Sequence, residues 1–131
     1  MKLLLDTHIW LWMTLEPHKI ARAVRRGIER QQNEIFLSPI SIWEAGQSHR
    51  RQRLRIRQEF HLWLEQPLIR MPVQEAPLNF AVATEASRIH LPQPDPGDLF
   101  LAATASVFGM TLVTADPQLL QCRWLKTLAN D

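Results

Sequence analysis

Short apolar runs alternate with longer amphipathic stretches along the chain. Three of the short runs consist of apolar or β-branched residues with polar boundaries, which predicts buried strands: residues 2–5, 34–37 and 111–114. Two further runs are weaker strand candidates: residues 68–73, which contain Pro72, and residues 123–125, as an edge strand.

The stretches between these runs predict helices. Residues 19–32 repeat apolar side chains at helical spacing, with arginines on the opposite face. Ser38 and Pro39 suit the N-cap and the first position of a helix that includes Glu44. The remaining predicted helices are residues 9–15, residues 60–64 before Pro67, residues 79–89, residues 99–108 closed by Gly109, and a short helix after Asp116.

Strands that alternate with helices are typical of an α/β domain with a mainly parallel sheet. The chain has 131 residues, which is the usual size of one compact domain. No repeat, low-complexity tract or linker divides it, so we expect a single domain over residues 1–131.

The composition favours a globular protein with some affinity for phosphate groups. Apolar residues make up 46% of the chain and charged residues 21%, with a formal net charge of +2. Only three of the 15 basic residues are lysines; the others are arginines, whose planar guanidinium binds phosphate in a bidentate manner. The single cysteine, Cys122, excludes an internal disulfide and fits a reducing compartment.

No segment predicts secretion or a membrane span. The N-terminal apolar run stops at Asp6 after three leucines, which is not the pattern of a secretory signal. The longest uncharged stretch, residues 99–115, is slightly short for a span, and a buried helix followed by a buried strand explains it better. We therefore expect a cytoplasmic protein with no membrane partner.

Four acidic residues are predicted at one edge of the sheet, where its parallel strands end. Asp6 directly follows the first strand, and Asp116 follows the strand at residues 111–114 after one residue. Glu44 lies one to two turns into its helix, and Asp98 lies in the first turn of the helix after a proline-rich loop. Because open parallel sheets bind ligands beyond the carboxyl ends of their strands, all four can reach the same rim.

Each of these acids also has a purely structural explanation. Asp116 precedes a proline and suits an N-cap, and Asp6 can cap the helix that follows it. Asp95 can cap the next helix, which makes Asp98 an acid that the helix dipole favours. A solvated position on the helix surface would explain Glu44, but Glu44 lies among apolar and small residues, where an unpaired carboxylate is expensive to bury. Convergent carboxylates without lysine partners are compensated by a divalent cation, and hard oxygen ligands favour Mg²⁺ or Mn²⁺.

At these positions the sequence resembles the PIN-domain nucleases, specifically the VapC-type toxins of bacterial type II toxin–antitoxin systems. The resemblance covers nearly the whole chain and rests on four motifs in the family's order: LLLDTHIWLW, LSPISIWEAG, DPGDLFLAATA and MTLVTAD. It implies a three-layer α/β/α sandwich around a mainly parallel sheet, in one PIN-like domain.

The resemblance also implies the chemistry of the site and its partners. Asp6, Glu44 and Asp98 match the family's three acidic metal-site residues, and Asp116 matches a fourth, more variable one. The implied activity is endoribonuclease cleavage of RNA with Mg²⁺ or Mn²⁺, neutralised by a cognate antitoxin protein. A homodimer or a toxin–antitoxin hetero-oligomer is expected.

Two threonines and one basic segment complete the predicted site. Thr114 precedes the fourth acid in the family's motif, and Thr7 follows Asp6; both are candidate supporting residues. Five arginines fall within eight residues and are candidates for binding RNA: Arg50, Arg51, Arg53, Arg55 and Arg57. A solvated helix face or loop explains these arginines equally well. His8 is the one histidine that we expect near the acids.

The predicted antitoxin contact involves the tryptophans and the acids together. We expect an antitoxin segment to lay apolar residues on a groove lined by the region of Trp10, Trp12 or Trp43. A basic side chain from that segment, most simply an arginine, would then point toward the acidic rim, where a guanidinium can bind two carboxylates at once.

Two positions depart from the family's pattern. Leu99 stands where an arginine often follows the third acid, and Gln93-Pro94 stands where a histidine often precedes the DPxD segment. A PIN-like domain that cuts weakly, and mainly binds RNA or an antitoxin, is therefore the alternative to an active ribonuclease. A phosphoacceptor receiver domain is set aside, because it needs two adjacent acids where this chain has Asp6-Thr7.

Overall fold

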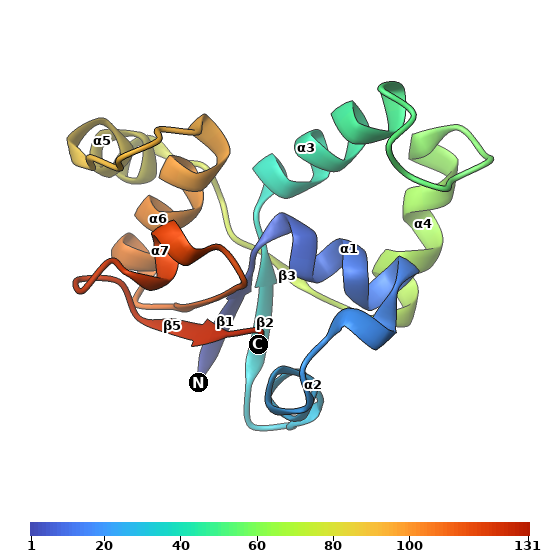
Figure 1. Ribbon diagram of the computed structural model, residues 1–131, viewed down its shortest axis with the longest axis horizontal. Coiled ribbons are helices and arrows are strands. Elements are labelled where there is room, and N and C mark those ends of the chain that lie inside the picture. The colour runs from blue at the N-terminus through green and yellow to red at the C-terminus, as the bar shows by residue number, and fades with distance from the viewer.

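A five-stranded sheet organises the molecule in the computed structural model, which describes residues 1–131 (Figure 1). Its strands are β1 (Lys2–Leu5), β2 (Glu34–Leu37), β3 (Gln74–Glu75), β4 (Thr111–Thr114) and β5 (Thr127–Ala129). They lie in the order β3-β2-β1-β4-β5, and every neighbouring pair is parallel. Parallel neighbours need crossover connections, and the helices supply most of them.

The helices occupy most of the chain between the strands. They are α1 (Thr7–Leu15), the 3-10 turn η1 (Pro17–Lys19), α2 (Arg22–Glu29), α3 (Pro39–Arg50), α4 (Phe60–Arg70), α5 (Phe80–Arg88), α6 (Pro96–Phe108) and α7 (Pro117–Leu120). No helix combines the length and the apolar character that crossing a bilayer would require.

Side chains of the central strands alternate between the two faces of the sheet. Leu3 and Leu5 pack on one face and Leu4 on the other, and all three are fully buried. In β4, Leu112 and Val113 divide between the faces in the same way. A strand buried on both faces reads as a continuous apolar run, which is why these segments could be predicted from the sequence.

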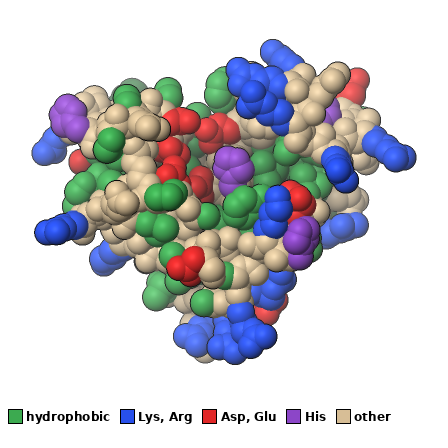
Figure 2. Space-filling model, viewed as in Figure 1, with side chains coloured by type: hydrophobic (Ala, Val, Ile, Leu, Met, Phe, Trp, Pro, Cys, Tyr) green, Lys and Arg blue, Asp and Glu red, His purple; other side chains and the backbone are tan.

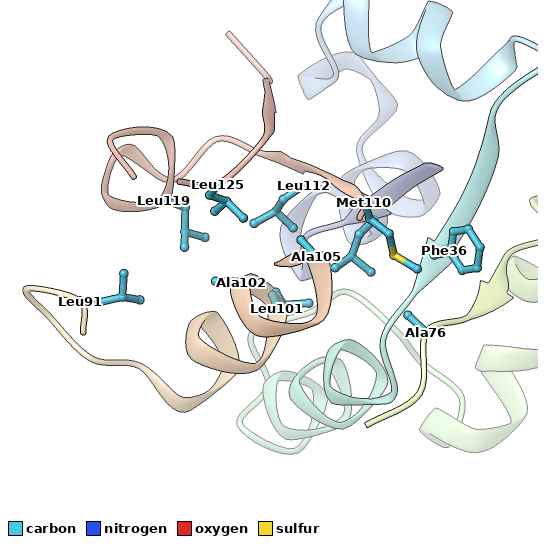
Figure 3. Close-up of a cluster of buried hydrophobic side chains, with 11 residues drawn as sticks. Phe36, Ala76, Leu91, Leu101, Ala102, Ala105, Met110, Leu112, Leu119 and Leu125 are labelled. Atoms are coloured by element: carbon cyan, nitrogen blue, oxygen red, sulfur yellow. The ribbon is translucent and has the colours of Figure 1, made fainter. Parts of the chain in front are cut away.

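Helices cover both faces, so the protein is a three-layer α/β/α sandwich, as predicted (Figure 1). On one face, α6 and α7 enclose a cluster that includes Leu101, Leu112 and Leu119, drawn in Figure 3. α5 packs on the outside of α6 through Val82 and Ala103.

The other face is covered by α1 to α4. Its cluster contains Ile9, Trp10, Val24 and Ala45, all with no exposed surface. The ring of Trp10 meets the ring of Trp63 edge-on, with centroids 6.0 Å apart. Trp10 is therefore a core side chain and is unavailable to a partner, contrary to its place in the predicted antitoxin groove.

Two elements in the middle of the chain have bounds that differ from the prediction. α4 continues to Arg70 instead of ending before Pro67. Pro67 lacks an N–H, but its ring is buried, and its carbonyl accepts the N–H of Met71 at 3.1 Å, so tertiary packing sustains the helix through the proline. The strand predicted at residues 68–73 is consequently displaced to Gln74–Glu75, where it pairs with Phe36–Leu37.

Two other elements also differ from the prediction. The helix predicted at residues 19–32 is divided, because Ile20 and Ala21 are extended between η1 and α2. The edge strand predicted at residues 123–125 lies instead at Thr127–Ala129, after a turn in which the Leu125 N–H donates to the Cys122 carbonyl at 3.1 Å. Leu125 is apolar because it belongs to the core cluster of Figure 3 rather than to a strand.

Candidate active site

The predicted acids surround the carboxyl ends of the two central strands. β2 lies on one side of β1 and β4 on the other, so the strand order reverses between β1 and β4. Open α/β sheets bind ligands at such a reversal. Asp6 follows β1, Asp116 follows β4, and Glu44 and Asp98 come from α3 and from the first turn of α6.

All four acids line one cavity of about 420 Å³, together with a fifth carboxylate, Asp95. The other lining residues are Thr7, His8, Leu11, Trp12, Ser48 and Ala115. Figure 2 shows acidic side chains gathered in a hollow between the α5–α6 side and the α3–α4 side of the molecule. A larger hollow of about 630 Å³ lies between α1, α2 and α4, but its only charged side chains are Glu29 and Arg70. The chemistry of the lining, rather than its size, therefore identifies the site.

Asp6 is held rigidly at the end of β1. Its side chain is 7% exposed. Oδ1 accepts the Thr7 N–H at 2.7 Å, which caps α1, and Oδ2 accepts the Thr114 hydroxyl at 2.7 Å. Capping and a place in the acidic cavity are thus combined in one residue, so the two explanations offered by the sequence do not exclude each other.

Glu44 is bound to the same corner through Thr7. The Thr7 hydroxyl donates to Glu44 Oε1 at 2.6 Å. The Ser41 hydroxyl lies one turn earlier on α3 and is hydrogen-bonded to Thr7 Oγ1 at 2.9 Å. A hydroxyl has one proton, so Ser41 donates here while Thr7 donates to Glu44. Thr7 therefore connects Asp6 and Glu44, through its N–H and its hydroxyl.

The DPGD segment at the start of α6 brings two aspartates to the cavity. Asp95 caps the helix, because its Oδ1 accepts the Gly97 N–H at 2.8 Å. Asp98 follows in the first turn, and its pKa is raised to about 7 by burial and by the charges of Asp6, Asp95 and Asp116.

Asp116 is joined to Asp6 through Thr114. Its N–H donates to Thr114 Oγ1 at 3.0 Å, while the Thr114 hydroxyl donates to Asp6. Asp116 also caps α7, since its Oδ1 accepts the Gln118 N–H at 2.9 Å. Thr114 is fully buried, so the link between the two acids is shielded from solvent.

The cavity has an uncompensated negative charge. Burial is the largest cause that raises the pKa of Asp6 and of Glu44, neighbouring acids raise both further, and His8 lowers both. None of the cavity acids forms an ion pair with a lysine or an arginine. Partly desolvated carboxylates that repel one another are stabilised by a divalent cation.

The donor set fits a hard divalent cation, although the side chains in their present positions leave the coordination shell open. No three histidine, cysteine or acidic side chains converge closely enough on one point to hold an ion. One oxygen of Glu44 is bound by Thr7 and one oxygen of Asp116 by α7. Closing a shell therefore requires the carboxylates to turn toward one another.

Comparison with known proteins assigns this fold to a family. Residues 3–125 match the PIN domain. The chain is 30% identical over 117 residues to Ribonuclease VapC22 of Mycobacterium tuberculosis, and the match covers 88% of each chain. The chain belongs to the PIN-domain family, as a VapC-type ribonuclease. The predicted resemblance to the VapC-type toxins of toxin–antitoxin systems is confirmed, and PIN-domain nucleases are typically metal-dependent.

Solved structures share the fold of this VapC-type chain at low sequence identity. VapBC2 from Rickettsia felis, bound to a DNA fragment from its promoter, has a TM-score of 0.74 at 18% identity, over 100% of both chains. DNA-bound VapBC from Salmonella typhimurium has a TM-score of 0.72 at 16% identity, over 100% of this chain and 99% of that one. FitAcB from Neisseria gonorrhoeae has a TM-score of 0.69 at 19% identity, over 98% and 97%. At these identities the likeness shows the fold alone.

The two departures from the VapC pattern lie outside the acidic cavity. Leu99 is partly buried against the core cluster of Figure 3 and adds no charge. The backbone of Gln93 is bound to one side chain: its N–H donates to Gln118 Oε1 at 2.6 Å, and its carbonyl accepts from Gln118 Nε2 at 3.2 Å. Neither residue displaces an acid from the cavity.

The five candidate arginines form a separate exposed segment. Arg50 ends α3, and the other four lie in the connection to α4. All five are exposed, and none is paired with a carboxylate. Ser48 lines the acidic cavity and lies two residues before Arg50, so α3 leads from the cavity to this segment. Figure 2 shows basic side chains next to the acidic hollow, on the α3–α4 side.

Sequence reasoning missed three residues that shape the site: Ser41, Asp95 as a cavity residue, and Gly97. Asp95 was interpreted as a cap, and its distance along α6 from Asp98 could have placed it on the same rim. The importance of Ser41 and Gly97 depends on contacts between α3, α1 and α6, which no local pattern encodes.

Proposed function

We propose that this VapC-type ribonuclease holds Mg²⁺ or Mn²⁺ with Asp6, Glu44, Asp98 and Asp116 and uses the site to hydrolyse RNA phosphodiester bonds. The main support is that these acids share one cavity in which burial raises the pKa of Asp6, Glu44 and Asp98 and no basic side chain pairs with them. Such a site has a strong electrostatic demand for a cation with oxygen ligands.

Each residue has a distinct task in this proposal. A divalent ion held by these residues would activate water and stabilise the charge that develops on the phosphate. Asp6 and Asp98 are the central ligands. Asp6 is fixed by two hydrogen bonds, and the pKa of Asp98 is raised by the charges of three neighbouring acids. Glu44 and Asp116 complete the donor set from α3 and from the start of α7. Thr7 and Thr114 orient these carboxylates.

The arginines of residues 50–57 are the proposed contact with the RNA backbone. Phosphates need a basic surface beside the acidic cavity, since the cavity itself repels the RNA. The segment is exposed and unpaired, and α3 connects it to the rim. Binding through phosphates has a strong salt dependence, so this role can be measured.

A cleavage assay on the purified protein without antitoxin tests the proposal. RNA should be cut with Mg²⁺ or Mn²⁺ and remain intact with a chelator, and Ca²⁺ serves as a control for a cation of the same charge. Cleavage that continues unchanged in chelator would overturn the metal assignment. Absence of cleavage with every divalent ion, despite RNA binding, would favour a domain that binds without cutting. Sequencing of RNA ends after induction in cells would then identify the target.

An antitoxin is the proposed protein partner. Several solved structures with the same fold contain VapBC or FitAB, and one of them, VapBC-5 from Mycobacterium tuberculosis, is a member of the VapBC family of toxin–antitoxin systems. Trp12 lines the acidic cavity and Trp43 is 61% exposed, so both are accessible to a partner. An arginine from the antitoxin directed at Asp6, Glu44 and Asp98 would supply the missing positive charge.

Metal titration distinguishes an antitoxin arginine that enters the acidic cavity, here called a charged plug, from an antitoxin that only covers the RNA path. If an arginine enters the cavity, the toxin–antitoxin complex should bind Mn²⁺ much more weakly than the free toxin does. Equal Mn²⁺ affinity in the complex and in the free protein would eliminate the charged plug while leaving the partnership intact.

A further inference from the structure

Glu44 is held differently from the three acids of the cavity that cap helices. Asp6, Asp95 and Asp116 each cap a helix and accept a backbone N–H. Glu44 is in the second turn of α3, and its carboxylate accepts only the Thr7 hydroxyl. Glu44 also has the longest side chain among the cavity acids. The position of its carboxylate therefore depends on the residues that contact it rather than on its own backbone.

The first constraint on the Glu44 carboxylate is the backbone of Gly97, which has no side chain. Gly97 is buried in the first turn of α6, directly beside the Glu44 carboxylate. A Cβ on Gly97 would overlap Glu44 Oε2 and would lie 2.7 Å from Glu44 Cδ, distances that ordinary packing does not allow. The backbone of Gly97 has no left-handed φ, so what glycine provides here is space for the Glu44 carboxylate rather than a special backbone conformation.

The second constraint on the Glu44 carboxylate is a pair of hydroxyls. Thr7 donates to Glu44 Oε1 at 2.6 Å, and Ser41 holds Thr7 in place at 2.9 Å. Ser41 has no exposed surface, and Thr7 is 5% exposed. Ser41 and Glu44 are three residues apart on α3 and thus on the same helix face. The hydroxyls of Ser41 and Thr7 and the Glu44 carboxylate form one chain of hydrogen bonds where α1 and α3 meet.

We propose that Ser41 and Gly97 are positioning residues that together set the place of the Glu44 carboxylate in the metal site. Gly97 provides the space that the carboxylate occupies, and Ser41 fixes the one donor that holds it there. This inference rests on the proposed role of Glu44 as a metal ligand. Outer residues that orient a ligand change metal affinity by about 10–100-fold when they are altered.

The first test compares the same substitution at two helical glycines. Gly97→Ala should weaken Mn²⁺ binding by about 10–100-fold and lower kcat without changing the KM for RNA. The melting temperature of the metal-free protein should not fall, because alanine favours a helix and Glu44 is a flexible side chain that can move away. Gly27→Ala is the matched control, since its Cβ would make ordinary contacts, 3.5 Å from Leu3 and 3.6 Å from Leu128. It should bind Mn²⁺ as the native protein does.

A double-mutant cycle then links Gly97 to Glu44 specifically. Glu44→Asp shortens the side chain by one methylene and withdraws the carboxylate from α6. Gly97→Ala should reduce the Mn²⁺ affinity of that variant much less than it reduces the Mn²⁺ affinity of the native protein. Independent, additive losses would show that Gly97 acts on some other part of the site and would overturn the proposal.

Ser41→Ala tests the role of the hydroxyl pair. It should weaken Mn²⁺ binding by about tenfold, and Ser41→Thr, which keeps the hydroxyl, should retain more affinity if the added methyl is accommodated. Thr104→Val is the control for loss of a buried hydroxyl, because the Thr104 hydroxyl binds only the Phe100 carbonyl. Equal Mn²⁺ affinity in Ser41→Ala and in the native protein would remove Ser41 from the proposal.

The same titrations separate failure of this inference from failure of the proposed metal site. If Asp98→Asn abolishes Mn²⁺ binding while Gly97→Ala and Ser41→Ala leave it intact, the metal site stands and the positioning roles are wrong. If Asp98→Asn also binds Mn²⁺ normally, the metal assignment itself is wrong, and the positioning roles fall with it.

Discussion

The acidic cavity and the arginine segment are the two most charged regions of the molecule, and they are built in opposite ways. The cavity collects Asp6, Glu44, Asp98 and Asp116 from four separate parts of the chain and partly buries them. The segment of residues 50–57 places its five arginines almost consecutively, all exposed and without ion pairs. One region depends on exact placement and the other on charge density.

This difference follows from what each region is proposed to bind. A metal ion has a short, directional coordination shell, so its ligands must be fixed by secondary structure and by hydrogen bonds such as those of Thr7 and Thr114. An RNA backbone presents repeated, mobile phosphates, which a flexible basic surface can meet in several registers. Single substitutions should therefore have large effects in the cavity and small effects in the segment.

The largest expected effect is the loss of one cavity charge. Asp6→Asn and Asp98→Asn preserve side-chain shape but remove the charge that attracts a hard cation, so each should lower Mn²⁺ affinity and RNA cleavage by at least about 100-fold. Circular dichroism should show an intact fold. Asp131→Asn, at the exposed end of the chain, is the matched control and should have no effect. Full cleavage by either cavity variant would end the acidic-site hypothesis.

An intermediate effect is expected in the arginine segment, and only when several charges are removed together. Replacing Arg51, Arg53 and Arg55 by alanine should weaken RNA binding by roughly tenfold and reduce the slope of log affinity against log salt by about 2. Mn²⁺ binding should not change. The control replaces Arg22, Arg26 and Arg30, three exposed arginines on and after α2, which removes the same net charge elsewhere. If both triple variants lower the slope equally, the segment has no special role.

The smallest expected effect is on the pH dependence of stability in the absence of metal. The pKa of Asp98 is about 7 in the folded protein and 3.8 is its ordinary value, so folding favours the protonated form. Its contribution to stability is full below about pH 4 and is lost as the pH rises toward 7. Because this carboxyl is only half-buried, solvent screening reduces the loss to about 1 kcal/mol.

Urea unfolding in chelator between pH 4.5 and 8 measures that loss. The native protein should become less stable relative to Asp98→Asn as the pH rises, and Mn²⁺ should restore the stability of the native protein only. The triple arginine variant should follow the pH profile of the native protein. A stability difference between native protein and Asp98→Asn that is constant with pH would contradict the raised pKa of Asp98.

Local patterns determined much of the fold. The apolar runs of β1, β2 and β4 were predicted at their observed bounds, because a strand buried on both faces has an unmistakable composition. The N-caps at Ser38, Asp95 and Asp116 were predicted for the same kind of reason, since a capping side chain binds a backbone N–H within a few residues. The gathering of the acids at one rim also followed, because strand ends in a parallel sheet share an edge.

Contacts between distant segments were decided only by the tertiary structure. The Thr114 hydroxyl reaches Asp6 across 108 positions of the chain, and Gly97 meets Glu44 because α6 and α3 cross at the rim. Tertiary packing also allows α4 to continue past Pro67, so that β3 begins only at residue 74, and it buries Trp10 completely. Propensity and periodicity describe one segment at a time, whereas burial and hydrogen bonding depend on which segment lies opposite. The sequence by itself therefore determined that Asp6, Glu44, Asp98 and Asp116 meet, whereas the assembled helices added Asp95 and decided how each carboxylate is held.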